Sequence, residues 1–302
     1  MTAGNAILAG LPEPLAVVCH DAGAANIILS WLPGKTMHIR PFMAGPAALL
    51  WQRRFPNSRP FDTLEETLAG ASALLSGTGW ASQVEHKSRG LARHHCIRSV
   101  AVIDHWVNYR SRFVRDGNTV LPDEIWVTDQ EALRIANACF PKLSIRIKPN
   151  LYLEEQLLRI GPVPPFGVGD VLYVAEPAGS DWGRGTPGEF QALDYFLAHR
   201  TAVGIADDVA IRLRRHPSES ATKYDDWLAH HSLKPVWLEP ERDLSEALRG
   251  ARWVAGCQSF ALVIALASGR DVVSTLPPWA PECALPHKGL IRLKDRVERE
   301  KP

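Results

Sequence analysis

Short apolar runs alternate with longer amphipathic segments along nearly the whole chain. In the first half, this pattern predicts strands at 15–20, 36–42, 72–77, 98–104, 123–129 and 143–149, and helices at 24–32, 61–71, 82–95 and 130–140. In the second half, it predicts strands at 171–177, 210–217, 234–240, 252–257 and 271–276, and helices at 188–200, 222–231, 243–251 and 260–269. Strands that alternate with helices are typical of an α/β protein with largely parallel sheets.

The segment 160–170 interrupts this alternation with three prolines and three glycines. Such a composition between two periodic regions is typical of a linker. We therefore predict two Rossmann-like, doubly wound domains, at 1–160 and 171–302, joined by a linker at 161–170. Ligands of open α/β sheets bind at the carboxyl ends of the strands, which predicts a binding cleft between the domains.

Composition narrows the functional classes. The chain has 302 residues, 46% of them hydrophobic, and a formal net charge of +1. This balance argues against a nucleic-acid-binding protein, which usually carries a basic face. Five scattered cysteines without a CxxC pair are typical of reduced thiols, and the N-terminus lacks the basic start of a secretory signal. We expect a cytoplasmic protein, and the sequence leaves peripheral membrane association open.

Two turns in the second half are candidates for binding an anion. The predicted strand at 210–217 ends in Arg214, Arg215, His216 and Pro217, and the helix at 260–269 follows the turn at 258–259. Unpaired N–H groups at a helix start favour phosphate, with a serine hydroxyl as a further donor. The structural alternatives are a solvated strand end, a histidine packed in a loop and a serine that only caps its helix. Because both turns follow strands of one sheet, we expect them at the same edge.

The His216-Pro217 corner and the segment 256–273 resemble the C-terminal domain of GT-B glycosyltransferases. They are most similar to the bacterial sialyltransferase, polysialyltransferase and Kdo-transferase type enzymes, which use CMP-activated acidic sugars. The resemblance implies that His216, with Pro217, and Ser259, with Gln258 beside it, hold the donor phosphate, and that His216 assists the departure of CMP. Many UDP- and GDP-sugar enzymes of this fold carry a glutamate on the following helix, whereas 260–269 has no acidic residue. This departure favours CMP over UDP.

The first half offers candidates for the catalytic base and the acceptor site. His20, Asp21 and Gly23 lie where the first strand turns into a helix, without the GxGxxG spacing of a dinucleotide fingerprint. A carboxylate there can deprotonate an acceptor hydroxyl, so Asp21 is the preferred base. Its structural alternative is an N-cap of the helix. A second glycine-rich strand-to-helix turn contains Thr78 and leads to Glu85.

Further polar side chains follow other predicted strands. Asp104 ends the strand at 98–104 and precedes His105, two aromatic residues, Arg110 and a further arginine. Arginine forks match carboxylates, so this segment is a candidate wall for an acidic sugar or its acceptor. Its structural alternative is aromatic packing with solvated arginines. Asp104 and Glu85 are secondary candidates for the base. Glu176 follows the first strand of the second domain and is a candidate donor-binding residue.

Taken with these residues, the resemblance implies a metal-independent glycosyltransferase of polysaccharide biosynthesis without a cofactor. The domain at 171–302 would bind the nucleotide sugar, a CMP-linked sialic acid- or Kdo-like sugar, and the domain at 1–160 a glycan or other hydroxyl acceptor. The chain lacks the GxSxG and Walker A motifs, and the histidine pair at 94–95 lacks zinc spacing. Two alternatives stay open: a nucleotide-sugar epimerase of the same architecture and a non-catalytic nucleotide-sugar-binding protein.

Overall fold

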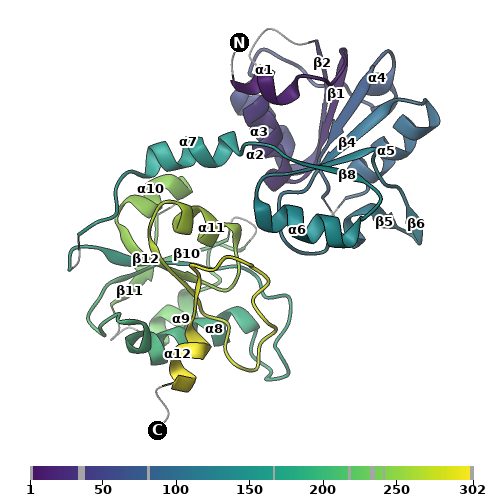
Figure 1. Cartoon of the computed structure of the whole chain (residues 1–302). Helices are drawn as coiled ribbons and strands as arrows, with labels where there is room; N and C mark the ends of the chain where they lie inside the picture. Colours follow the sequence, from purple (N-terminus) through teal and green to yellow (C-terminus); the bar gives the residue numbers. More distant parts are fainter. Residues whose placement is uncertain are drawn as a thin grey trace. The chain divides into compact units, whose positions relative to one another are not determined.

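The computed structural model describes residues 3–32, 38–79, 82–165, 167–216, 219–231, 235–240 and 242–299. The chain divides into two compact units, Met1–Glu154 and Glu155–Pro302 (Figure 1). The division falls within helix α7 (Leu151–Ile160), and the proline- and glycine-rich segment 161–170 follows this helix. The interdomain cleft expected from the sequence stays a prediction.

Unit 1 is built on a six-stranded parallel sheet. Its strands, in spatial order, are β2 (Ile39–Met43), β1 (Leu15–Cys19), β3 (Ala73–Ser76), β4 (Arg98–Val102), β7 (Glu124–Val127) and β8 (Ser144–Ile147). The second strand lies on one side of β1 and the later strands lie on the other. The direction of the strand order therefore reverses between β1 and β3. In open α/β sheets, ligands bind at the carboxyl ends of the strands at such a switch point.

Both faces of the unit 1 sheet are buried, and β1 shows why. Leu15, Val17 and Cys19 belong to one apolar cluster, which also contains residues of α1 (Ala3–Leu8), α2 (Ala22–Trp31) and α3 (Gly45–Arg54). Ala16 and Val18 belong to another, with residues of α4 (Leu64–Leu68) and α5 (Val84–His94). Because side chains alternate between the faces of a strand, a strand covered on both sides reads as a continuous apolar run. Helix α6 (Gln130–Cys139) joins β7 to β8.

Unit 2 has a second six-stranded parallel sheet (Figure 1). Its strands, in spatial order, are β11 (Val236–Leu238), β10 (Ile211–Arg214), β9 (Asp170–Val174), β12 (Ala251–Gly256), β13 (Asp271–Ser274) and β14 (Ile291–Arg292). The first strand, β9, lies in the middle, so the switch point falls between β9 and β12. The helices are α8 (Gly188–His199), α9 (Asp225–His230), α10 (Leu244–Arg249), α11 (Phe260–Ala267) and α12 (Leu293–Arg299).

The predicted α/β class with two doubly wound parallel sheets is confirmed. Thr63 caps α4, because the Glu66 N–H donates to Thr63 Oγ1 at 3.1 Å. Helices α1, α3, α7 and α12, the small hairpin of β5 (Val114–Arg115) and β6 (Asn118–Thr119), and β14 were not predicted. No described helix combines the length and apolar character that crossing a bilayer requires.

Candidate functional site

The carboxyl end of β1 brings together three residues predicted from the sequence. The His20 N–H donates to Glu85 Oε1 at 2.7 Å, and His20 Nδ1 lies 3.1 Å from Asp21 Oδ1. Asp21 occupies the N-cap position of α2, yet its side chain makes no capping hydrogen bond. The capping alternative therefore does not account for this carboxylate, whose side chain is 28% exposed and accessible to a ligand.

A buried arginine ties the neighbouring turns to this edge. Arg112 Nη1 lies 3.0 Å from Asp104 Oδ1 and 3.3 Å from both the carbonyl and the hydroxyl oxygen of Thr78. Thr78 itself donates to the Val102 carbonyl at 2.9 Å. The ends of β3 and β4 are thus joined by one guanidinium, which is 5% exposed. Five donors in a rigid fork suit this bridging role.

Two glycines allow the carboxylates to approach the backbone. A Cβ on Gly23 would collide with Asp104 Oδ2, and a Cβ on Gly79 would collide with Asp21 Oδ2. Asp104 therefore lies against the first turn of α2, and Asp21 lies against the turn after β3. These contacts place Asp21, Gly23, Thr78 and Asp104 at one site, the β1/β3 switch point.

Glu85 adds a buried carboxyl group to this site. Its side chain is fully buried, and Oε2 has no hydrogen-bond partner among the described residues. Burial raises the pKa of Glu85, with a smaller contribution in the same direction from Asp21. Burial and the three carboxylates Glu85, Asp21 and Asp104 also raise the pKa of the Cys19 thiol. The bond to the His20 N–H makes Glu85 a positioning residue for the turn that carries Asp21.

The segment after Asp104 is only partly placed at this site. His105 Nδ1 accepts the Trp106 N–H at 2.9 Å, and the Trp106 indole donates to the Asp129 carboxylate. Trp106 is 6% exposed, so its ring packs within unit 1 and leaves little surface for stacking on a sugar. Arg110 is exposed and lines a different pocket, which contains none of the other predicted site residues. Arg112, and not Arg110, binds Asp104 and Thr78 at the site.

Replacement of Arg112 by methionine is expected to lower the free energy of unfolding by about 3–5 kcal/mol, because Asp104 would keep a half-buried, uncompensated charge. Chemical denaturation measures this change. The matched control is Arg134→Met, whose ion pair with Glu131 is largely exposed and should change stability by less than about 1 kcal/mol. Equal effects of the two substitutions would show that Arg112 does not hold the site together.

In unit 2, the strand register aligns three predicted residues at one edge. Val174 of β9 pairs with Arg214 of β10 on one side and with Gly256 of β12 on the other. Glu176, His216 and Gln258 each lie two residues beyond this row, at the carboxyl ends of adjacent strands. Neighbouring strands are about 4.8 Å apart, so the strands that lead to His216 and Gln258 lie on either side of the strand that leads to Glu176. This is the β9/β12 switch point.

The start of α11 is already partly occupied by groups of the chain itself. Glu176 Oε1 accepts the Gln258 N–H at 2.7 Å, and Ser259 Oγ accepts the Ala261 N–H at 3.2 Å. The Gln258 side chain accepts the Ala284 N–H at 3.0 Å. Ser259 is therefore the N-cap of α11, which agrees with the structural alternative given for it in the sequence analysis. A phosphate bound at the start of α11 would therefore lie beside the Glu176 carboxylate, which already accepts the Gln258 N–H.

The turn after β10 is stabilised by a charged cluster that the sequence did not indicate. Glu219 accepts the His216 N–H at 2.9 Å, and Lys223 forms ion pairs with both Glu219 and Glu189. Burial lowers the pKa of His216, and Lys223 acts in the same direction while Glu219 opposes it. The imidazole is thus predominantly neutral at pH 7, and an added phosphate would raise its pKa and promote protonation.

The arginines of the predicted anion site lie beside this turn. Arg214 ends β10, and both Arg214 and Arg215 are half-buried. Within β10, Ile211 and Leu213 are buried in the core, so Arg214 projects to the other face. Pro217 lies outside the described residues.

Glu176 is expected to make stability depend on pH. Burial raises its pKa from 4.5 to about 7, and Glu219 adds to this, so the folded protein holds this proton more tightly between those values. The contribution of Glu176 to stability therefore falls as pH rises from 4.5 through about 7. Glu176→Gln should be up to about 3 kcal/mol more stable than wild type near pH 8, with little difference near pH 4. Denaturant midpoints of wild type and Glu176→Gln, measured between pH 4 and pH 8, test this prediction. A stability difference between the two proteins that does not change with pH would contradict it.

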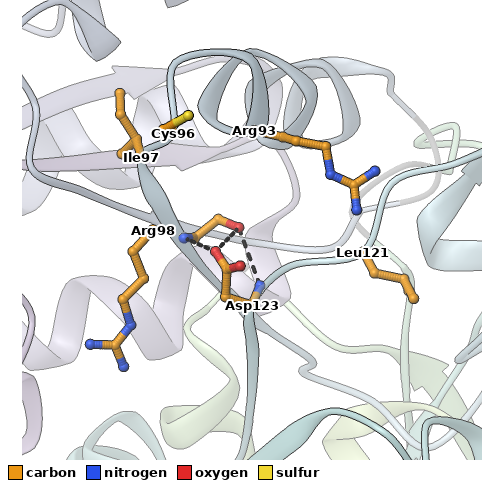
Figure 2. Close-up of a pocket in the computed structure, with 7 residues that line it drawn as sticks. Arg93, Cys96, Ile97, Arg98, Leu121 and Asp123 are labelled. Atoms are coloured by element: carbon orange, nitrogen blue, oxygen red, sulfur yellow. Dashed lines mark hydrogen bonds between the residues drawn. The ribbon is translucent and has the colours of Figure 1, made fainter.

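A further pocket lies at the opposite end of the unit 1 sheet, where β4 begins. It has a volume of about 440 Å³ and contains none of the predicted site residues. Asp123 lines this pocket (Figure 2). Its carboxylate accepts hydrogen bonds from the Ser99 backbone N–H at 2.7 Å and from the Ser99 hydroxyl at 3.1 Å. Within the described ranges, no group of three or more His, Cys, Asp or Glu side chains is arranged to hold a metal ion.

Comparison with known proteins concerns the fold. No protein-family model matches the chain, and no curated protein matches its sequence. The structure resembles S. aureus MnaA, solved with UDP, at a TM-score of 0.58 and 11% identity over 86% of this chain and 78% of that one. A putative UDP-N-acetylglucosamine 2-epimerase from Listeria monocytogenes gives a TM-score of 0.61 and 14% identity over 94% and 86% of the chains. The fold is GT-B-like.

A third solved structure, described as a UDP-N-acetylglucosamine 2-epimerase, supports the same assignment. Its TM-score is 0.51 at 10% identity, over 87% of this chain and 79% of that one. The GT-B part of the resemblance drawn from the sequence is thus supported. The narrower resemblance to sialyltransferase and Kdo-transferase type enzymes stays a prediction.

Proposed function

We propose that the protein is a glycosyltransferase that uses a nucleotide sugar as donor. The observation that carries the proposal is the row formed by Val174, Arg214 and Gly256 on three adjacent strands. Glu176, His216 and Gln258 follow these strands beside the β9/β12 switch point. Imidazole and backbone N–H groups favour phosphate, and the switch point is where ligands of this sheet type bind. The GT-B-like fold supports a nucleotide-sugar substrate.

In the proposed reaction, unit 2 binds the nucleotide sugar and unit 1 supplies the base that activates the acceptor. The bond between the anomeric carbon and the donor phosphate oxygen breaks, and its electron pair stays on the phosphate. His216 and the amides at the start of α11 stabilise that charge. The acceptor hydroxyl oxygen forms the new bond to the anomeric carbon, and its proton passes to the Asp21 carboxylate. Asp21 suits this role because no helix-capping bond occupies it.

The position of Glu176 bears on the choice of nucleotide. A CMP-linked acidic sugar is the donor proposed from His216-Pro217 and Ser259. The absence of a carboxylate from α11 favoured CMP, but Glu176 places a carboxylate at the start of that helix from the neighbouring strand. This group can accept ribose hydroxyls, so UDP suits the site as well as CMP.

A thermal-shift series with CMP, UDP, GDP and NAD tests the proposal. A ligand that binds only the folded state raises its melting temperature. We expect stabilisation by one of the first three nucleotides and a loss of that shift in Ser259→Pro, which removes the amide donor at the start of α11. The control Ser268→Pro alters the other end of the helix. Stabilisation by NAD alone, or by none of the four, would contradict the proposal.

The second candidate is a nucleotide-sugar epimerase. The observation in its favour is the pKa of about 7 at Glu176, because such a carboxyl can release and accept a proton near neutral pH. Incubation of nucleotide sugars in deuterated water without acceptor separates the candidates. An epimerase incorporates solvent deuterium into the recovered sugar nucleotide, whereas a transferase leaves it unlabelled. A non-catalytic binding protein would bind the nucleotide but would form neither an epimerised sugar nucleotide nor a glycosylated acceptor, whether or not acceptor is present.

A further inference from the structure

A second pocket of unit 1 has chemistry unlike that of the switch-point site. It has a volume of about 390 Å³, within the usual range of small-molecule pockets. It lies between the β5–β6 hairpin and the end of α6. Its apolar walls are formed by Val114, Leu121, Phe140, Pro141 and Leu143.

One wall of this pocket is fixed in the core. The Phe140 ring packs edge-on against Phe113, with ring centroids 5.2 Å apart and an interplanar angle of 89°. Phe113 is fully buried. Val114, which also lines the pocket, is 36% exposed. The pocket therefore combines a packed aromatic wall with apolar surface that is open to solvent, which favours binding of an apolar group.

The charges around this pocket have one sign. Arg110 and Lys142 are the charged residues that line it, and no acidic side chain among the described residues does so. Neither cation has a side-chain hydrogen bond or ion pair within the described part of the chain. An anion would gain two charge-assisted contacts here without competing with an internal carboxylate.

We propose that this pocket binds an amphipathic anion, whose apolar body fills the space beside Phe140 and whose carboxylate or phosphate group pairs with Arg110 and Lys142. The pocket shares no residue with the sites at β1/β3 and β9/β12. The proposal is thus independent of the proposed transferase activity.

Cys139 provides a direct readout, because it lines the pocket and is half-buried. Decanoate and decyl phosphate, used separately below their micelle concentrations, are expected to slow alkylation of Cys139. The reduction should be about tenfold at a concentration ten times the dissociation constant. Peptide mass spectrometry follows each cysteine, and exposed Cys96, outside this pocket, is the internal control. Protection by either compound supports the proposal, and the comparison of the two identifies the preferred head group.

Charge and shape are tested separately. Decanol and decyltrimethylammonium should protect Cys139 at least about tenfold less well, since neither supplies an anion. The double variant Arg110→Gln/Lys142→Gln replaces two exposed side chains and should lose the protection, whereas Lys87→Gln, an exposed control in the same unit, should keep it. Protection of Cys96 to the same extent, equal protection by decanol, or no protection by either anion would overturn the proposal.

Discussion

Replacing His216 with alanine is expected to lower the rate of sugar transfer by about two to four orders of magnitude. His216 follows the carboxyl end of β10, which is one strand from β9, the strand before Glu176, and two strands from β12, the strand before α11. The substitution removes a hydrogen-bond donor to the phosphate that departs in the transition state. The value of kcat should therefore fall by a larger factor than the affinity for the nucleotide sugar. Initial rates with saturating donor and acceptor measure the effect.

The matched control for this substitution is His230→Ala. His230 is an exposed histidine at the end of α9 in the same unit, and its loss should leave transfer unchanged. The turn at His216 is held by its backbone N–H bond to Glu219, which alanine retains. Wild-type-like turnover of His216→Ala, or equal losses in both variants, would remove His216 from the mechanism.

Replacing Asp21 with asparagine is expected to lower transfer by a similar amount, about two to four orders of magnitude. Asparagine keeps the size of the side chain and can still accept a hydrogen bond from His20, but it cannot take a proton. Nucleotide binding should be unchanged, because the proposed donor site lies at the β9/β12 switch point of the other unit. Parallel measurement of transfer and nucleotide affinity tests both statements.

Asp62→Asn provides the comparison for Asp21. The Asp62 side chain is 76% exposed and paired only with Arg59 in the described structure, so its substitution should be silent in both assays. Loss of nucleotide affinity in Asp21→Asn would indicate that the carboxylate acts in donor binding. Retention of full activity would identify another base, with Asp104 as the next candidate.

Much of the fold follows from local sequence because the central strands of both sheets are buried on both faces. Strands such as β1 read as unbroken apolar runs, and their ends are marked by polar or glycine-rich turns. Helix α3 was not predicted because Ala47 and Trp51 are its only buried residues, so its apolar periodicity is weak. Its start nevertheless carries a signal, a proline in the first turn.

The candidate sites were predictable where chemistry follows a strand directly. Asp21, Asp104, Glu176 and His216 all stand within two residues of a strand end, and parallel strands bring such residues to one edge. The register that aligns them depends on strand order, which the sequence pattern does not specify. Site residues that lie on longer connections between elements were not predicted, because the sequence pattern does not specify where those connections lie in space.

Arg112 and Glu189 illustrate what local patterns cannot reveal. Arg112 reaches the ends of β3 and β4 from a short helix beyond them, whereas the neighbouring Arg110 points to a different pocket. Glu189 lies on α8 and reaches Lys223 far along the chain, so no spacing relates the two. By contrast, Glu219 and Lys223 are four residues apart, a spacing that brings oppositely charged side chains together within a helical turn.

A crystal structure with bound nucleotide tests the central claim most directly. The account predicts that one phosphate group lies within about 2.7–3.2 Å of both a His216 ring nitrogen and a backbone N–H at the start of α11. A nucleotide whose phosphates contact only one of these two turns, or that binds at the β1/β3 edge of unit 1, would contradict it.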